Sequence, residues 1–224
     1  MDSSAVRELG VLSVISFAAK HADLLANNST PAINARAPVV RAAVSGLELA
    51  YGASRPLRAL WSLAVKAKDA ADDDLDDTIS ALSYDLLGPS ILKGDRDAAD
   101  YRVLFPEGNI DFINGPDRAE LAQVNAIASH LEQTPTHPMA GRATLIRQKA
   151  AVMDAAMGPV AAAETTYRNS LAVQRARKEA VVRVLRKNVR FLRDQLDGDE
   201  AKVDALFPTV AECKTKEEYP DPMA

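Results

Sequence analysis

A single seam of side chains, spaced alternately four and three residues apart, runs through residues 140–196. Its apolar members are Ile146, Ala150, Met153, Met157, Val160, Tyr167, Leu171, Val181, Leu185 and Leu192. This period of 3.5 residues is typical of helices that pack lengthwise in coiled coils and bundles. The seam also carries four polar residues, namely Glu164, Gln174, Lys178 and Asn188. The pattern therefore predicts a bundle contact with polar interruptions, not an uninterrupted coiled coil.

Helical patterns also cover most of the remaining chain. Apolar spacing predicts helices over residues 3–26, 39–68 and 117–133. The acidic residues 72–77 are expected to begin a further helix, because carboxylates are favoured in the first turn of a helix. Alanine is abundant, aromatic residues make up only 5% of the chain, and no alternating strand pattern of useful length is found. The sequence thus predicts an all-α protein.

Two glycine–proline pairs bear on the length of these helices. Gly52 and Pro56 interrupt the pattern that starts near Val39, and Gly158 and Pro159 interrupt the seam. Proline has no backbone N–H and its ring clashes with the carbonyl four residues earlier. Both helices are therefore expected to kink or break at these points.

Three short segments recur in the same order at nearly the same spacing. Thr30-Pro31 recurs as Thr134-Pro135, Leu92-Lys93-Gly94-Asp95 as Leu196-Asp197-Gly198-Asp199, and Leu104-Phe105-Pro106 as Leu206-Phe207-Pro208. Their common order suggests an internal duplication. We predict an elongated antiparallel helical bundle of two similar helical units, residues 1–113 and 114–210, followed by a flexible tail, residues 211–224.

Charge and cysteine content narrow the classes of partner and compartment. The formal net charge of −4 disfavours a general nucleic-acid binder, which usually carries a basic excess. The only apolar run near the N-terminus is too short to span a bilayer, and no basic segment precedes it. One cysteine excludes an intrachain disulfide and fits a reducing compartment. We expect a cytoplasmic protein without a membrane partner.

The sharpest chemical signal is the acidic run, where Asp-Asp-x-x-Asp occurs twice. Its candidate metal ligands are Asp72, Asp73, Asp76 and Asp77. Carboxylates at this spacing share a helix face and could hold magnesium against a diphosphate, and the motif is similar to that of helical isoprenoid synthases. No second aspartate-rich motif accompanies it. The competing interpretation is a solvated acidic helix start.

Two further features are candidates for interaction. Arg183, Arg186, Arg190 and Arg193 lie three or four residues apart and line one helix face, which could bind phosphate groups. Aromatic residues for base stacking are lacking nearby, and cations are also favoured near a helix C-terminus. Phe105 and Phe207, in the two Leu-Phe-Pro segments, are either structural plugs or docking residues for a partner.

No other recognised catalytic pattern is found. The three histidines form no metal-binding pair, and no glycine-rich phosphate loop, nucleophile elbow or cysteine cluster occurs. The sequence therefore favours a non-catalytic structural or interaction protein without a cofactor, whose main partner is a second copy of itself, with another protein partner left open. The alternatives are a magnesium-dependent enzyme acting through residues 72–77 and nucleic-acid binding through residues 183–193.

Overall fold

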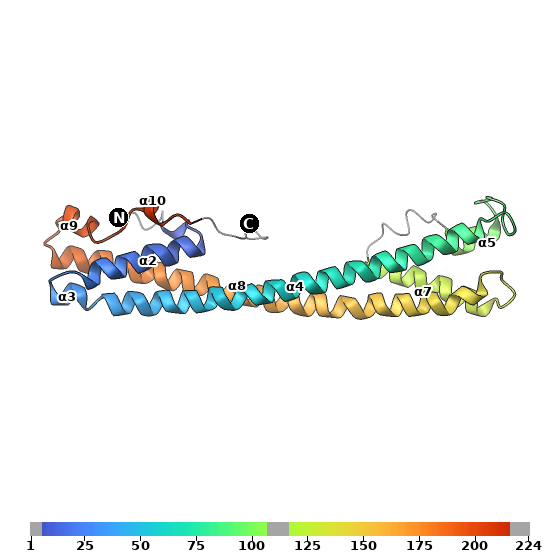
Figure 1. Ribbon diagram of the computed structural model, residues 1–224, viewed down its shortest axis with the longest axis horizontal. Coiled ribbons are helices and arrows are strands. Elements are labelled where there is room, and N and C mark those ends of the chain that lie inside the picture. Colours follow the sequence, from blue (N-terminus) through green and yellow to red (C-terminus); the bar gives the residue numbers. More distant parts are fainter. Residues whose placement is uncertain (1–5, 107–116, 216–224) are drawn as a thin grey trace. The chain divides into compact units, whose positions relative to one another are not determined.

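The computed structural model describes residues 6–106 and 117–215, which are predominantly helical and contain no strand (Figure 1). The elements in chain order are α2 (Val11–Ala26), α3 (Pro31–Asn34), α4 (Ala37–Leu86), α5 (Ala99–Leu104), α7 (Asp117–Gln133), η1 (Ala140–Arg142), α8 (Ala143–Gln195), α9 (Glu200–Asp204) and α10 (Val210–Cys213). The predicted all-α helical bundle is confirmed.

The chain divides into two compact units. The first unit comprises residues 1–58 and 166–224, and the second unit comprises residues 59–165. Each unit therefore takes residues from both of the predicted sequence halves, 1–113 and 114–210. The compact units are defined by contacts in space and not by repeated sequence, so they do not test the two predicted repeats, which remain a prediction.

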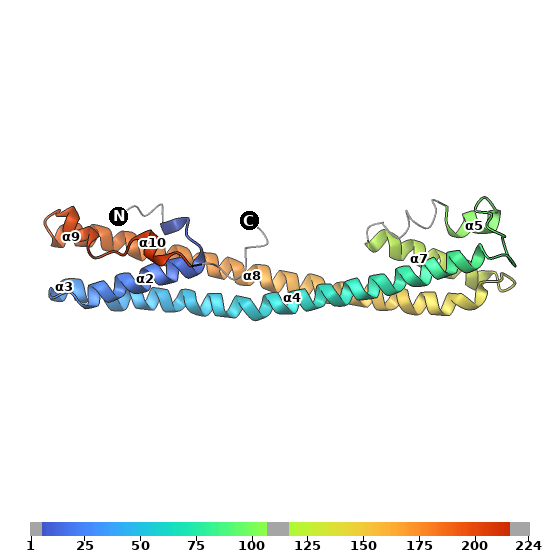
Figure 2. The same ribbon diagram turned by 45° about the horizontal axis from the view of Figure 1, so that its top comes forward.

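The first unit has its core between α2 and the adjoining parts of α4 and α8 (Figures 1 and 2). From α2, Val14, Phe17 and Leu25 point into this core, at the spacing that gives a helix one apolar face. Leu47 of α4 and Leu185 of α8 are fully buried against them. The C-terminal elements α9 and α10 add further core residues, including Val203 and Cys213.

The second unit repeats this pattern with α7 in place of α2. Val124, Ala128 and Leu131 of α7 are fully buried against α4 and α8. Lys149 of α8 pairs with Asp74 of α4 at 2.5 Å, so α4 and α8 lie side by side in this unit. Arg142, which precedes Lys149 in the sequence, pairs with Asp85, which follows Asp74. Moving towards the N-terminus from Lys149 to Arg142 thus corresponds to moving towards the C-terminus from Asp74 to Asp85, so the two segments run antiparallel.

The heptad seam of α8 was predicted correctly. Ile146, Met153 and Leu192 are fully buried, and the other seam residues are buried or half-buried. The seam serves two separate cores, since Met153 belongs to the second unit and Leu185 to the first.

The prediction that the two long helices break at their prolines was wrong, because both helices are continuous there. Pro56 lies inside α4, which spans 50 residues, and Pro159 lies inside α8, which spans 53. Both prolines are exposed. The carbonyl that each proline leaves without a donor belongs to Gly52 or Ala155, which are exposed as well, so water can satisfy it.

The predicted helix start at residues 72–77 was also wrong, because these residues lie in the interior of α4. Leu75 and Ile79 are four residues apart and fully buried, which holds this stretch in the helix. The charge of the run is partly offset by Lys68 and Lys149, which bind Asp72 and Asp74. Packing on one face outweighs the preference of aspartate for a helix terminus.

Two of the recurring segments share a backbone conformation. Lys93 and Gly94 both have positive φ (52° and 83°), and so do Asp197 and Gly198 (51° and 76°). In each turn the aspartate N–H that follows donates to the carbonyl three residues earlier, Asp95 to Leu92 and Asp199 to Leu196. A left-handed pair needs glycine at its second position, because other side chains are strained there.

The first residues of the predicted tail belong to α10. Thr209 and Glu212 form a capping box at the beginning of α10, in which each side chain bonds the other residue's backbone N–H. Cys213 is 1% exposed and belongs to the first core. Residues 216–224 lie outside the described part of the chain, as do residues 107–116, which contain the predicted boundary between residues 113 and 114.

Candidate functional site: an acidic cluster between α4 and α7

The acidic run of α4 is divided between two faces of the helix. Asp72 and Asp76 lie one turn apart on the side of Leu75 and are half-buried, whereas Asp73 and Asp77 are exposed. A helix turns about 100° per residue, so neighbouring carboxylates cannot all point the same way. The four predicted metal ligands are therefore not brought together on one face.

A fifth carboxylate, Glu120 of α7, joins the half-buried pair. Its side chain is only 3% exposed and lies within hydrogen-bonding reach of the Asp76 carboxyl. Burial, followed by the negative charge of Asp76, raises the pKa of Glu120 to about 8. Burial raises the pKa of Asp76 as well. Ionising both carboxyl groups together is unfavourable, because their negative charges repel each other.

Lys68 supplies the positive charge next to this pair. Its Nζ lies 3.5 Å from Asp72 and 3.1 Å from Asp117, the first residue of α7. It thereby links α4 to the beginning of α7. Neither bond involves Asp76 or Glu120.

Several oxygens of the acidic cluster, defined here as Asp72, Asp76, Asp117 and Glu120, have no partner. Asp72 Oδ1, Asp76 Oδ1 and Glu120 Oε1 are buried without a hydrogen bond in the described part of the chain. Buried polar atoms are normally satisfied, so such atoms mark a place where protonation or a ligand matters. Among residues 6–106 and 117–215, however, no three histidine, cysteine or acidic side chains are arranged to hold a metal ion. The predicted magnesium site stays a prediction.

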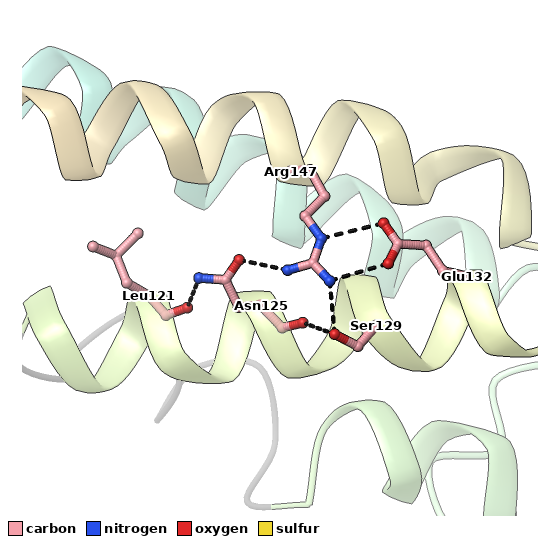
Figure 3. Close-up of polar contacts among 5 residues, drawn as sticks. All are labelled: Leu121, Asn125, Ser129, Glu132 and Arg147. Carbon is pink, nitrogen blue, oxygen red and sulfur yellow. Dashed lines mark hydrogen bonds and ion pairs between the residues drawn. The ribbon is translucent and has the colours of Figure 1, made fainter.

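Near its C-terminus, α7 is held to α8 by a pair of opposite charges. Arg147 of α8 reaches α7, where it donates to both carboxylate oxygens of Glu132, at 3.2 and 3.0 Å (Figure 3). The same guanidinium also donates to Asn125 Oδ1 and Ser129 Oγ. Every group in this contact has a complementary partner, so it is structural. In the acidic cluster, by contrast, Lys68 binds Asp72 and Asp117 but neither Asp76 nor Glu120.

The predicted arginine face lies on α8 in the first unit, and all four of its arginines are exposed. Arg193 is engaged by Glu200 of α9 at 2.7 Å. The face is thus accessible in part, but one of its ends is already paired within the unit.

The two phenylalanines of the Leu-Phe-Pro segments are core residues, not docking residues. Phe105 is 2% exposed and packs on Tyr101, with ring centroids 5.1 Å apart. Phe207 is 8% exposed and stacks on His21 at 4.0 Å. Burial of each ring in its own unit leaves neither one on the surface for a partner.

Sequence reasoning missed a buried polar network in the first unit. His21 is completely buried, its Nδ1 bonds the carbonyl oxygen of Leu206 at 2.7 Å, and its Nε2 accepts from Asn188 at 3.1 Å. Asn188 Oδ1 in turn accepts two bonds from Arg36. Burial lowers the pKa of His21 to about 4, against the opposing effect of the Leu206 bond. The imidazole is therefore neutral and fully satisfied, which is a structural arrangement.

Comparisons with known proteins give no further guide to function, since no family model, curated protein or solved structure matches the chain. Within residues 6–106 and 117–215, no helix combines the length and the apolar character needed to cross a membrane.

Proposed function

We propose that this protein is a non-catalytic helical structural protein that associates with a second copy of itself. The observation that carries the proposal is an exposed apolar face on α4. Leu60 and Leu63 are 57% and 62% exposed, and Ala67 and Ala70 continue the same face. These residues are spaced three and four apart, as on the contact face of a packed helix.

This face belongs to the part of the second unit that α7 leaves uncovered. The buried core residues of α4 in this unit begin at Ala71, and those of α8 end at Met153. Near Met153, α8 also exposes apolar side chains, with Val152 55% exposed and Ala155 on the surface. A pair of helices covers only one side of each, so further apolar faces call for another helix.

The first unit has a corresponding feature. Leu49 of α4 is 73% exposed, and Val173 of α8 is 54% exposed. Large apolar side chains exposed on both long helices favour a partner that is itself helical.

A second copy is the partner that best fits these faces. Lys66 and Asp69 beside the α4 face carry opposite charges, so two identical faces can meet without repulsion between charges of a single sign. A two-fold dimer also is the commonest assembly of identical chains. The exposed arginines of α8 and the exposed Asp73 and Asp77 could add pairs between copies. Exposed ion pairs contribute only about 0–1 kcal/mol each and would select orientation more than affinity.

The test replaces the two leucines of the face. We expect Leu60→Gln with Leu63→Gln to lower the mass measured by light scattering, while the circular dichroism spectrum stays helical. Val103→Gln on α5 is the matched control, because Val103 is 56% exposed but lies outside α4 and α8. A double variant that associates as strongly as the wild type would refute this role of the face.

We also propose that the chain arose by duplication of one helical unit. The support is that a short helix, a long helix and a left-handed turn follow one another twice in the same order. In the first copy these are α2, α4 and residues 93–94, and in the second copy they are α7, α8 and residues 197–198. The duplication predicts that, when the helices of residues 11–106 are superposed on the corresponding helices of residues 117–208, the turns at residues 93–94 and 197–198 will coincide. Phe105 and Phe207 both close the core of their unit, as the proposal requires.

A further inference from the structure

The charges of the chain are divided unevenly between its two compact units. Residues 59–165 contain 9 basic and 17 acidic side chains, whereas residues 1–58 and 166–224 contain 18 basic and 14 acidic ones. The second unit thus has a formal charge of −8 and the first unit a formal charge of +4. Opposite charges steer the first unit of one copy towards the second unit of another.

On α4, the exposed apolar face of the second unit leads into two acidic residues. Leu63 and Ala70 are followed, on the same side of the helix, by Asp73 and Asp77. These four residues, called here the α4 stripe, are spaced seven, three and four apart, as along one helix face. All four are exposed, and within the described part of the chain neither aspartate is paired with a cation.

On α8, the first unit carries a stripe of the same spacing that leads into two cations instead. This α8 stripe consists of Val173 and Ala180, followed by Arg183 and Lys187. Val173 is 54% exposed, Ala180 is half-buried and both cations are exposed. Among residues 6–106 and 117–215, neither cation has a carboxylate partner. The stripe points away from the core, because Leu185 on the opposite side of α8 is fully buried.

We propose that the α4 stripe of one copy packs parallel to the α8 stripe of a second copy. This inference rests on the self-association proposed above, and it specifies the surfaces that meet and their direction. Equal spacing brings all four positions into contact in one register. Leu63 then faces Val173, Ala70 faces Ala180, Asp73 faces Arg183 and Asp77 faces Lys187.

The direction follows from the cost of burying a charge without a partner. In an antiparallel arrangement the two aspartates would lie against Val173 and Ala180, where they would lose water without gaining a cation. In the parallel arrangement each aspartate gains a cation, and the small Ala70 and Ala180 let the helices approach closely. Two α4 stripes that faced each other would use the apolar residues but leave the aspartates without cations.

Tyr84 extends the same register by two turns. Its side chain is 80% exposed on α4, seven residues after Asp77, and Asp194 is exposed on α8, seven residues after Lys187. In the proposed contact the phenol hydroxyl can donate to this carboxylate. The register therefore gives an exposed aromatic residue a partner of fitting chemistry.

Charge reversal in the full-length protein tests the pairing, with the dissociation constant measured by sedimentation equilibrium at constant salt. Asp73→Lys with Asp77→Lys makes both stripes basic, and Arg183→Asp with Lys187→Asp makes both stripes acidic. Each double variant alone should have a dissociation constant about tenfold higher than the wild type or more, because like charges then meet. An equimolar mixture of the two should return close to the wild-type value, since each stripe finds the opposite charge on the other variant.

Two further variants separate the pairing from a general effect of charge or of misfolding. Asp100→Lys with Asp154→Lys changes the charge of the second unit equally at exposed positions outside both stripes, and should associate like the wild type. Asp73→Asn with Asp77→Asn keeps the side-chain shapes and should still raise the dissociation constant, by a smaller factor. Circular dichroism should show each variant to be as helical as the wild type, and recovery in the mixture itself requires folded stripes.

The failure of the pairing can be told apart from the failure of self-association. A wild type that stays monomeric would refute both together. If the wild type and both reversed variants associate with equal strength, or if the reversed variants associate weakly and do not recover when mixed, the pairing alone is overturned. If only the reversal on α8 weakens association, and nuclease treatment of the wild type does the same, the α8 stripe binds nucleic acid and the pairing is again overturned.

Discussion

Asn188 shows how one polar residue can organise a helical core. It sits on the seam of α8 at a position where the pattern calls for an apolar side chain, and it is completely buried. Its amide joins His21 of α2 to Arg36, which precedes α4, so three segments distant in sequence meet at one side chain. A polar residue in such a seam trades some stability for a fixed alignment of the helices.

Replacing Asn188 with Ala is expected to destabilise the first unit by about 1–3 kcal/mol, because buried His21 and Arg36 lose a partner. The measurement is urea denaturation followed by circular dichroism. Asn169→Ala, at an exposed position of the same helix, should stay within about 0.5 kcal/mol of the wild type. If both substitutions cost the same, the network would not contribute to stability.

The buried imidazole of His21 predicts a pH dependence of its own. Its pKa falls from 6.5 in the unfolded chain to about 4 in the folded one. The unfolded state binds the proton first, so the first unit should lose stability as pH falls from about 6.5 towards 4, by about 1.4 kcal/mol per pH unit. Denaturation at several pH values checks this slope. The slope should disappear in His21→Leu, and a slope that persists there would assign it to another group.

Part of this residue-level chemistry was visible in the sequence. The seam identified Asn188 as an interruption, and an interruption in an otherwise buried face is a signal for a polar partner. His21 shares the spacing of Val14, Phe17 and Leu25, which could have placed it in the core. Glu120 could not be found in this way, because its importance depends on which residues of α4 lie opposite α7.

Among the elements, α7 was predicted most accurately and α4 least. An acidic start and a loop with two prolines fix the ends of α7, and its observed bounds agree with the prediction. For α4, local rules for proline and aspartate predicted two helices. Packing of the stretch from Leu75 to Leu86 overrides them, and a single helix results. Local preferences are worth about 1–3 kcal/mol each, so several buried side chains outweigh them.

The contribution of the seam can be measured at Leu185 of α8, which is fully buried in the first unit. Leu185→Ala should cost about 2–5 kcal/mol, since it removes buried methyl groups and leaves a cavity. Lys187→Ala serves as the control, because Lys187 is exposed on the same helix. A loss below about 0.5 kcal/mol at Leu185 would show that the core is not organised around this seam.

At the scale of the whole molecule, the sequence predicted the fold class but not the composition of the compact units. The 3.5-residue pattern and the scarcity of strand signals specify helices, and these are local properties. The two units instead combine the beginning of α4 with the end of α8, and the end of α4 with the beginning of α8. That arrangement depends on antiparallel pairing, as in Asp74 with Lys149, which joins residues far apart in the chain.

We propose above that the exposed apolar faces of α4 and α8 bind a second copy of the chain. Sedimentation equilibrium over a range of protein concentrations, at low and at high salt, tests it most directly. We expect a mass that rises towards a multiple of 24.1 kDa at micromolar concentration, and an association that high salt weakens but does not abolish. A mass that stays at 24.1 kDa at the highest concentration would contradict it.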